Sequence, residues 1–158
     1  MEIEFTLNGR LTFAEIQDDI VLFDLLRQKG CYSVKCGCET ENCGLCTVLI
    51  NGKAMLSCSY LAARAENQDI VTLEGIKEEA DSFGMFLAGE GADQCGFCSP
   101  GLIMNVLAME QELSDPGEEE IKEYLAGNLC RCSGYMGQLR AVKKYLEARR
   151  LTGKGGLD

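Results

Sequence analysis

Residues 38–46 read CETENCGLC, and their three cysteines have the spacing C-x4-C-x2-C: Cys38, Cys43 and Cys46. This spacing is typical of plant-type ferredoxins, whose cysteines hold a [2Fe–2S] cluster. A loop of four residues can curl so that its backbone amides donate hydrogen bonds to the sulfur atoms. Gly37 and Gly44 permit a close approach that a Cβ atom would obstruct. The spacing therefore predicts an iron–sulfur centre with three ligands in one loop.

The fourth ligand of this centre must come from elsewhere in the chain. Cys58, which follows a hairpin signal at Asn51 and Gly52, is the candidate. This choice leaves Cys31 and Cys36 without a metal-binding role. We interpret both as buried packing thiols, because a free cysteine behaves as a small apolar side chain.

A second group of cysteines consists of the pair Cys95-x2-Cys98 and the later pair Cys130-x-Cys132. The first pair precedes one predicted helix and the second follows another, so the pairs can meet at one end of a helical bundle. Positions i and i+2 face apart on a helix, so the C-x-C pair fits a tight loop. Structural zinc sites with four cysteine ligands are the alternative for both groups, although such sites more often use two C-x2-C pairs.

The composition excludes several classes of function. The chain has 158 residues, ten cysteines and no histidine, which excludes His-containing zinc sites, Rieske centres and His-based acid–base catalysis. The first residues carry no secretory signal, and the closely spaced cysteines suit chelation better than disulfides. A formal net charge of −10 argues against a nucleic-acid partner, and no apolar run is long enough for a membrane span. We therefore expect a cytoplasmic protein.

The hydrophobic pattern divides the chain into two domains, residues 1–76 and residues 77–158. In the first domain, alternating apolar residues and Asn-Gly turns predict strands, and one segment has helical spacing. The predicted strands are residues 2–7, 11–16, 47–50 and 70–73. Asp18 or Asp19 is the expected N-cap of the helix, and Gly30 is its expected end. A small mixed sheet with one helix packed across it follows from this pattern.

The second domain has helical spacing throughout. The predicted helices are residues 82–90, 99–112, 118–125 and 136–150. Ser99 is the expected N-cap of the second helix, with Pro100 at its first position. The whole chain is therefore predicted to be α+β, with a β-rich domain followed by an all-α four-helix bundle.

Three segments together resemble a known family: residues 37–58 (GCETENCGLCTVLINGKAMLSC), residues 94–104 (QCGFCSPGLIM) and residues 127–135 (GNLCRCSGY). They are similar to the small iron–sulfur subunit of the molybdenum hydroxylases, the xanthine dehydrogenase and aldehyde oxidoreductase family. The resemblance covers nearly the whole chain, in order. It implies an N-terminal β-grasp ferredoxin-like domain and a C-terminal helical domain, each with one [2Fe–2S] cluster.

The resemblance also implies the role of each site residue. One cluster, near a flavin, would be held by Cys38, Cys43, Cys46 and Cys58. The other, near the molybdopterin, would be held by Cys95, Cys98, Cys130 and Cys132. Gln94 and Cys132 would also contact the molybdopterin. Glu39 and Glu41 depart from the family pattern, which often has glycine at these positions of the loop.

The function implied by the resemblance is an electron relay. Electrons would pass from a molybdopterin-binding large subunit, through the two clusters, to FAD on a medium subunit. We expect a purine such as xanthine as the substrate of the complex, with nicotinate, aldehydes and carbon monoxide as alternatives. The sequence shows no nucleophile–base pair, so we expect no substrate chemistry on this chain. A free-standing ferredoxin-type carrier is the competing function, although such a carrier needs no contact with a pterin.

Overall fold

The chain begins with a hairpin because Asn8 and Gly9 both adopt the positive φ that a tight two-residue turn requires. This turn joins β1 (Glu2–Leu7) to β2 (Arg10–Glu15) in an antiparallel pair. Asn51 and Gly52 form a second such turn, between β3 (Thr47–Ile50) and β4 (Lys53–Leu56). Both hairpins were predicted from their Asn-Gly pairs.

The computed structural model describes residues 1–153 and arranges the strands in one five-stranded sheet, in the order β2-β1-β5-β3-β4. The strand β5 (Asp69–Val71) runs parallel to β1 and antiparallel to β3. The helix α1 (Leu22–Gln28) packs its apolar residues into the core of this sheet. Short 3-10 turns, η1 (Ser57–Ser59), η2 (Ala62–Ala65) and η3 (Leu73–Gly75), complete this half. The arrangement confirms the predicted β-grasp fold.

The predicted N-cap of α1 is wrong, because the helix begins at Leu22 and its N-cap is Val21, which has no side-chain hydrogen bond. Backbone pairing determines this boundary: Leu22 donates its N–H to the carbonyl oxygen of Tyr60 at 2.7 Å, and Ala62 donates to that of Ile20 at 2.9 Å. The chain before the helix is therefore extended. The end of the helix is as predicted, since Gly30 has a φ of +89°.

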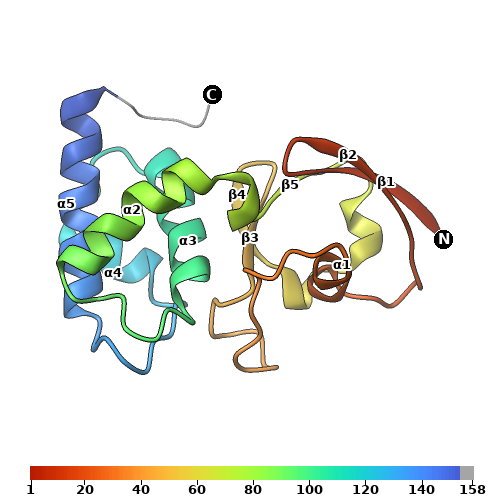
Figure 1. Ribbon diagram of the computed structural model, residues 1–158, viewed down its shortest axis with the longest axis horizontal. Helices are drawn as coiled ribbons and strands as arrows, with labels where there is room; N and C mark the ends of the chain where they lie inside the picture. Colours follow the sequence, from red (N-terminus) through yellow and green to blue (C-terminus); the bar gives the residue numbers. More distant parts are fainter. Residues whose placement is uncertain (154–158) are drawn as a thin grey trace.

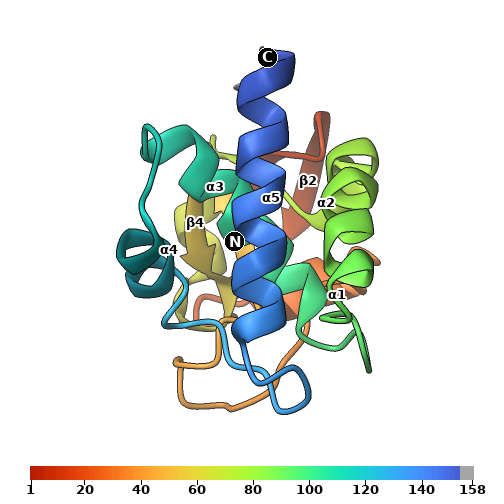
Figure 2. The same cartoon turned by 90° about the vertical axis from the view of Figure 1, so that its left-hand side faces the viewer.

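Four helices form the second half: α2 (Lys77–Gly89), α3 (Ser99–Glu112), α4 (Glu118–Tyr124) and α5 (Met136–Thr152). Figure 2 shows α5 in front, α2 and α4 on either side, and α3 behind. The predicted cap of α3 is wrong by one residue, because Cys98 already has helical dihedral angles and accepts the N–H of Leu102. The observed helices confirm the predicted all-α half.

The two halves are joined by α3, which lies against β3 (Figure 1). Leu49 of β3 belongs to the apolar core of the helical half. Asn105 of α3 donates a hydrogen bond to the hydroxyl oxygen of Thr47 at 3.0 Å. The cysteine-bearing loops of both halves lie on the lower side of the molecule in both views (Figure 1 and Figure 2). Among the helices of residues 1–153, none combines the length and apolar character that crossing a bilayer requires.

Candidate metal centres

The first predicted ligand set, which we call the N-terminal thiol group, is brought together by the loop before β3 and the turn η1: Cys38, Cys43, Cys46 and Cys58. Cys38 and Cys43 are neighbours that influence each other's pKa, and both Cys46 and Cys38 act on the pKa of Cys58. Burial and the neighbouring Cys46 raise the pKa of Cys58 to about 12. The four thiols therefore lie near enough for such pKa effects between them.

Backbone amides donate hydrogen bonds to Cys38, which is half-buried. The N–H groups of Asn42 and Thr40 lower the pKa of Cys38 to about 6. The Thr40 nitrogen lies 3.4 Å from the Cys38 sulfur. These amides stabilise negative charge on the sulfur, which is what a thiolate ligand carries.

Glu39 and Glu41, the departures from the family pattern, have φ values of 54° and 62°. This left-handed region is one that glycine adopts without strain and that a side chain with a Cβ atom disfavours. The loop therefore has the backbone conformation expected of glycine, with two carboxylates added at its surface.

The second predicted ligand set, the C-terminal thiol group, lies in the loops before α3 and before α5: Cys95, Cys98, Cys130 and Cys132. Its thiols also lie in two neighbouring pairs, in which Cys130 acts on the pKa of Cys98 and Cys95 acts on the pKa of Cys132. Burial and the neighbouring Cys130 raise the pKa of Cys98 to about 12. Ser133 donates its backbone N–H to the Cys130 sulfur at 3.3 Å.

Two further residues contact this group and are absent from the predicted site residues. Gln138 places its side-chain nitrogen 3.7 Å from the Cys98 sulfur. Tyr135, which has a φ of 70°, accepts the backbone N–H of Cys130 on its hydroxyl oxygen at 3.2 Å. Cysteine spacing carries no signal for either residue. The one available signal is that Gln138 interrupts an otherwise apolar stripe of α5.

Six of the eight predicted ligands line one cleft of about 370 Å3: Cys38, Cys43, Cys95, Cys98, Cys130 and Cys132. The backbone N–H of Leu129 donates to the carbonyl oxygen of Cys43 at 2.9 Å across this cleft. The Lys35 ammonium group lies 5.7 Å from the centre of the Phe97 ring, which is a second contact between the loops. These contacts bring the loop of Cys38 and Cys43 next to the loops of the C-terminal thiol group.

Cys31 and Cys36 lie outside both groups. Cys31 is 4% exposed and belongs to the core of the sheet, in agreement with the predicted packing role. Cys36 is exposed, so the packing prediction is wrong for this residue. All ten cysteines are free thiols. Among residues 1–153, no three Cys, Asp or Glu side chains are arranged to hold a single metal ion.

Two groups of four thiols, with backbone N–H donors to sulfur, fit the ligand set of a [2Fe–2S] cluster. The chain matches two family models: a 2Fe-2S iron-sulfur cluster binding domain over residues 5–73 and a [2Fe-2S] binding domain over residues 72–143. It is 40% identical to the nicotinate dehydrogenase small FeS subunit of Eubacterium barkeri, over 92% of this chain and 94% of that subunit.

This chain is a small iron–sulfur subunit of the molybdenum hydroxylase family.

Two further members of the family show how complete the match is. The xanthine dehydrogenase iron-sulfur-binding subunit of Escherichia coli O157:H7 is 47% identical over 84% of this chain and 86% of that subunit. The structure of quinoline 2-oxidoreductase from Pseudomonas putida 86 superimposes with a TM-score of 0.88 and 36% identity, covering 96% of each chain. The family membership confirms the resemblance found in the sequence. It identifies the chain as part of an oxidoreductase complex whose substrate chemistry lies on another subunit.

Proposed function

We propose that this chain relays electrons from a molybdopterin site, through a cluster on the C-terminal thiol group and a cluster on the N-terminal thiol group, to FAD on a partner subunit. Each bound [2Fe–2S] cluster supplies a centre that accepts and releases one electron. The proposed ligands are the eight cysteines of the two groups. We also propose the domain division at residues 76 and 77, and a cytoplasmic location, where free thiols persist.

The backbone contact between the two loops carries this proposal. Leu129 directly precedes Cys130, and its N–H donates to the carbonyl oxygen of Cys43. The route from one ligand to the other therefore consists of covalent bonds and a single hydrogen bond. A structural pair of metal sites has no need for such a direct connection between its ligands.

Exposed residues at the C-terminal thiol group support contact with a molybdopterin-binding large subunit. Gln94 and Cys132 are both exposed, which leaves them accessible to a pterin. Exposed apolar side chains, which we call the apolar rim, lie in the same loops or directly after them: Phe97, Leu129, Tyr135 and Met136. Apolar patches of this kind mark protein interfaces. A free-standing electron carrier would not need such a rim for a permanent interface.

We propose a purine such as xanthine as the substrate of the complex. The 47% identity to a xanthine dehydrogenase subunit supports this choice. Nicotinate is the second candidate, because the nicotinate dehydrogenase subunit aligns over a larger share of both chains. Copurification of the large subunit, followed by assays with xanthine and nicotinate, separates the two candidates.

Metal analysis of anaerobically purified protein tests the clusters. We expect about four iron and four acid-labile sulfide per chain, with two reduced-cluster EPR signals. A colourless protein with two zinc ions, which gains no colour on reconstitution with iron and sulfide, would contradict the proposal.

Cysteine variants test the ligand assignment. Cys38→Ser should remove one EPR signal and leave the other, whereas the control Cys31→Ser should leave both. Loss of a signal in Cys31→Ser would overturn the assignment. In the assembled complex, Cys132→Ser should abolish both the other cluster signal and reduction of the flavin by substrate. Retained flavin reduction would contradict the order of the relay.

A further inference from the structure

The inward face of α5 is apolar except at its first turn. Leu139, Val142, Tyr145 and Leu146 are buried along this face, as their helical spacing predicts. Gln138 is buried with them and is 6% exposed. Burial of an amide in apolar surroundings is costly unless the amide has a hydrogen-bond partner. Its presence at a core position therefore calls for a specific partner.

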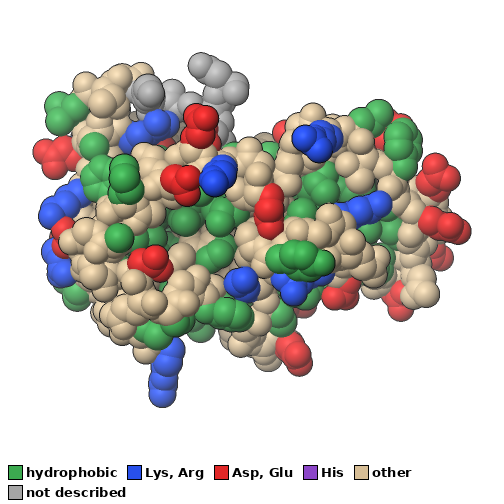
Figure 3. Space-filling view, in the orientation of Figure 1, with side chains coloured by type: hydrophobic (Ala, Val, Ile, Leu, Met, Phe, Trp, Pro, Cys, Tyr) green, Lys and Arg blue, Asp and Glu red, His purple; other side chains and the backbone are tan. Residues whose placement is uncertain are grey.

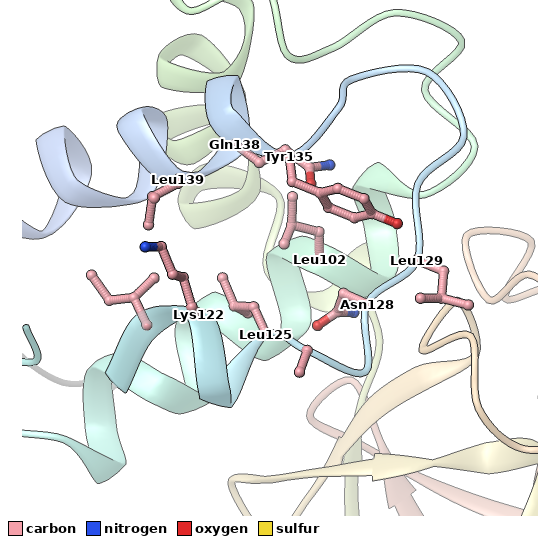
Figure 4. Close-up of a pocket in the computed structure, with 10 residues that line it drawn as sticks. Leu102, Lys122, Leu125, Asn128, Leu129, Tyr135, Gln138 and Leu139 are labelled. Carbon is pink, nitrogen blue, oxygen red and sulfur yellow. The ribbon is translucent and has the colours of Figure 1, made fainter. Parts of the chain in front are cut away.

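The partner is a sulfur atom of the C-terminal thiol group. The Gln138 side-chain nitrogen lies 3.7 Å from the Cys98 sulfur, at a distance suited to an N–H···S hydrogen bond. Figure 4 shows Gln138 beside Tyr135 at the wall of a cavity of about 300 Å3, with Leu102 and Leu139 nearby. The amide thus stands between a largely apolar cavity and the thiol.

We propose that Gln138 raises the reduction potential of the cluster on the C-terminal thiol group by donating its side-chain N–H to Cys98. This inference rests on the proposed function, because it requires a cluster at that group. Reduction adds one electron, part of whose charge resides on the thiolate ligands. A hydrogen bond to a ligand sulfur therefore stabilises the reduced form more than the oxidised form.

The effect is specific to one of the two clusters. In the N-terminal thiol group, the backbone N–H groups of Thr40 and Asn42 donate to the Cys38 sulfur. Gln138 contacts Cys98 through a side chain, so a substitution removes this donor alone. A single electron can reside on either cluster. Its transfer from one cluster to the other neither forms nor breaks a bond to the protein. Gln138 shifts this equilibrium towards the C-terminal cluster.

Potentiometric EPR titration of the full-length chain with dithionite tests this inference. In Gln138→Leu, the midpoint potential of the C-terminal cluster should become more negative, whereas that of the N-terminal cluster should not change. At half reduction, the ratio of the C-terminal to the N-terminal signal should fall by roughly two- to tenfold, which corresponds to the loss of one hydrogen bond. The Cys38→Ser variant identifies which signal belongs to which cluster.

Gln111→Leu, the same substitution at an exposed position of α3, is the matched control and should leave both potentials unchanged. Gln138→Met, a second variant without a donor, should reproduce the effect of Gln138→Leu. Unchanged potentials, or equal shifts in both clusters, would overturn the proposal. Failure of both variants to assemble the C-terminal cluster would assign Gln138 a purely structural role and would also overturn it. Absence of clusters from the wild-type chain would instead contradict the proposed function.

Discussion

At the scale of single residues, backbone strain is concentrated in the cysteine loops. Among residues 1–153, seven residues other than glycine have a positive φ, and four of them are Asn or Asp, which tolerate this conformation in turns. The other three are Glu39, Glu41 and Tyr135, and each lies close to a proposed ligand in the sequence. Backbone strain of this kind persists where the surrounding structure fixes the conformation, and it is found mainly at functional sites. Here the strained conformations place backbone amides and the Tyr135 hydroxyl group around the thiols.

Replacement of Glu41 by glycine should stabilise the protein. Glycine adopts the φ of 62° without the clash that a Cβ atom brings, so the gain should be about 1 kcal/mol. Urea unfolding of the cluster-bound protein, followed by circular dichroism, measures the change. The control is Glu123→Gly in α4, which should lower stability by about 1 kcal/mol, because glycine disfavours a helix. A loss of stability in Glu41→Gly would show that the carboxylate has a stabilising contact that outweighs the strain.

At the scale of elements, local signals predicted the fold well and tertiary contacts explain the exceptions. The Asn-Gly pairs predicted both hairpins, and the apolar stripe predicted α5. The first residue of α1 was not predictable, because backbone pairing with Tyr60 determines it and no local signal reports that contact. The same reason applies to Gln138, whose role depends on a cysteine that is 40 residues away along the chain. The cysteine spacing, in contrast, predicts two groups of thiols, and cysteines from both groups line one cleft.

Close contact between backbones holds α3 against the first cysteine loop. A Cβ atom on Gly101 would overlap the carbonyl oxygen of Gly44 and lie 3.0 Å from the Cα atom of Leu45. Gly44 in turn lies against the carbonyl oxygen of Gly127, in the segment before the C-x-C pair. These close backbone contacts hold the loop of Cys38 and Cys43 beside the C-terminal thiol group, so that cysteines of both groups line one cleft.

Gly101→Ala should therefore separate α3 from the loop. We expect a loss of stability of about 1–3 kcal/mol, as for overpacking of a core, and a weaker magnetic interaction between the two reduced clusters. Urea unfolding and EPR measure these effects. Gly84→Ala in α2 is the matched control, because nothing lies within 4 Å of the added Cβ atom. This control should gain about 0.5–1 kcal/mol. Equal behaviour of the two variants would show that the contact at Gly101 can relax.

At the scale of the whole molecule, the described chain has two apolar cores, and the cysteine loops outside them have little regular structure. One core joins the sheet to α1, and the other joins α2, α3 and α5 with part of β3. The cysteine loops lie between these elements and depend on other contacts for their order.

Acidic side chains gather at the end of the molecule that carries the N-terminus and β1 (Figure 3). The cysteine loops and this acidic end are therefore separate surfaces.

Removal of iron with a chelator should loosen the cysteine loops and leave the cores folded, because bonds between sulfur and iron supply the order of the loops. We expect faster tryptic cleavage after Lys35 and Arg131, which lie in the two loops, than in the cluster-bound protein. Cleavage after Arg10, at the first residue of β2, should proceed at the same rate in both forms. Mass spectrometry of the fragments measures the rates. Equal cleavage after Lys35 and Arg131 in both forms would show that the protein fold alone orders the loops.

The apolar rim leads to a prediction about assembly. Met136 is the first residue of α5 and is 56% exposed, at the end of the helix that adjoins the C-terminal thiol group. A charge at a rim that becomes buried on binding must lose its hydration, so Met136→Glu should weaken association with the molybdopterin-binding subunit by roughly tenfold or more. Leu151→Glu is the matched control, because Leu151 is exposed at the opposite end of the same helix. Copurification of coexpressed subunits measures association, and iron content shows that both variants retain their clusters. Normal copurification of Met136→Glu, together with loss in Leu151→Glu, would place the interface at the other end of α5 and remove the rim from the electron route.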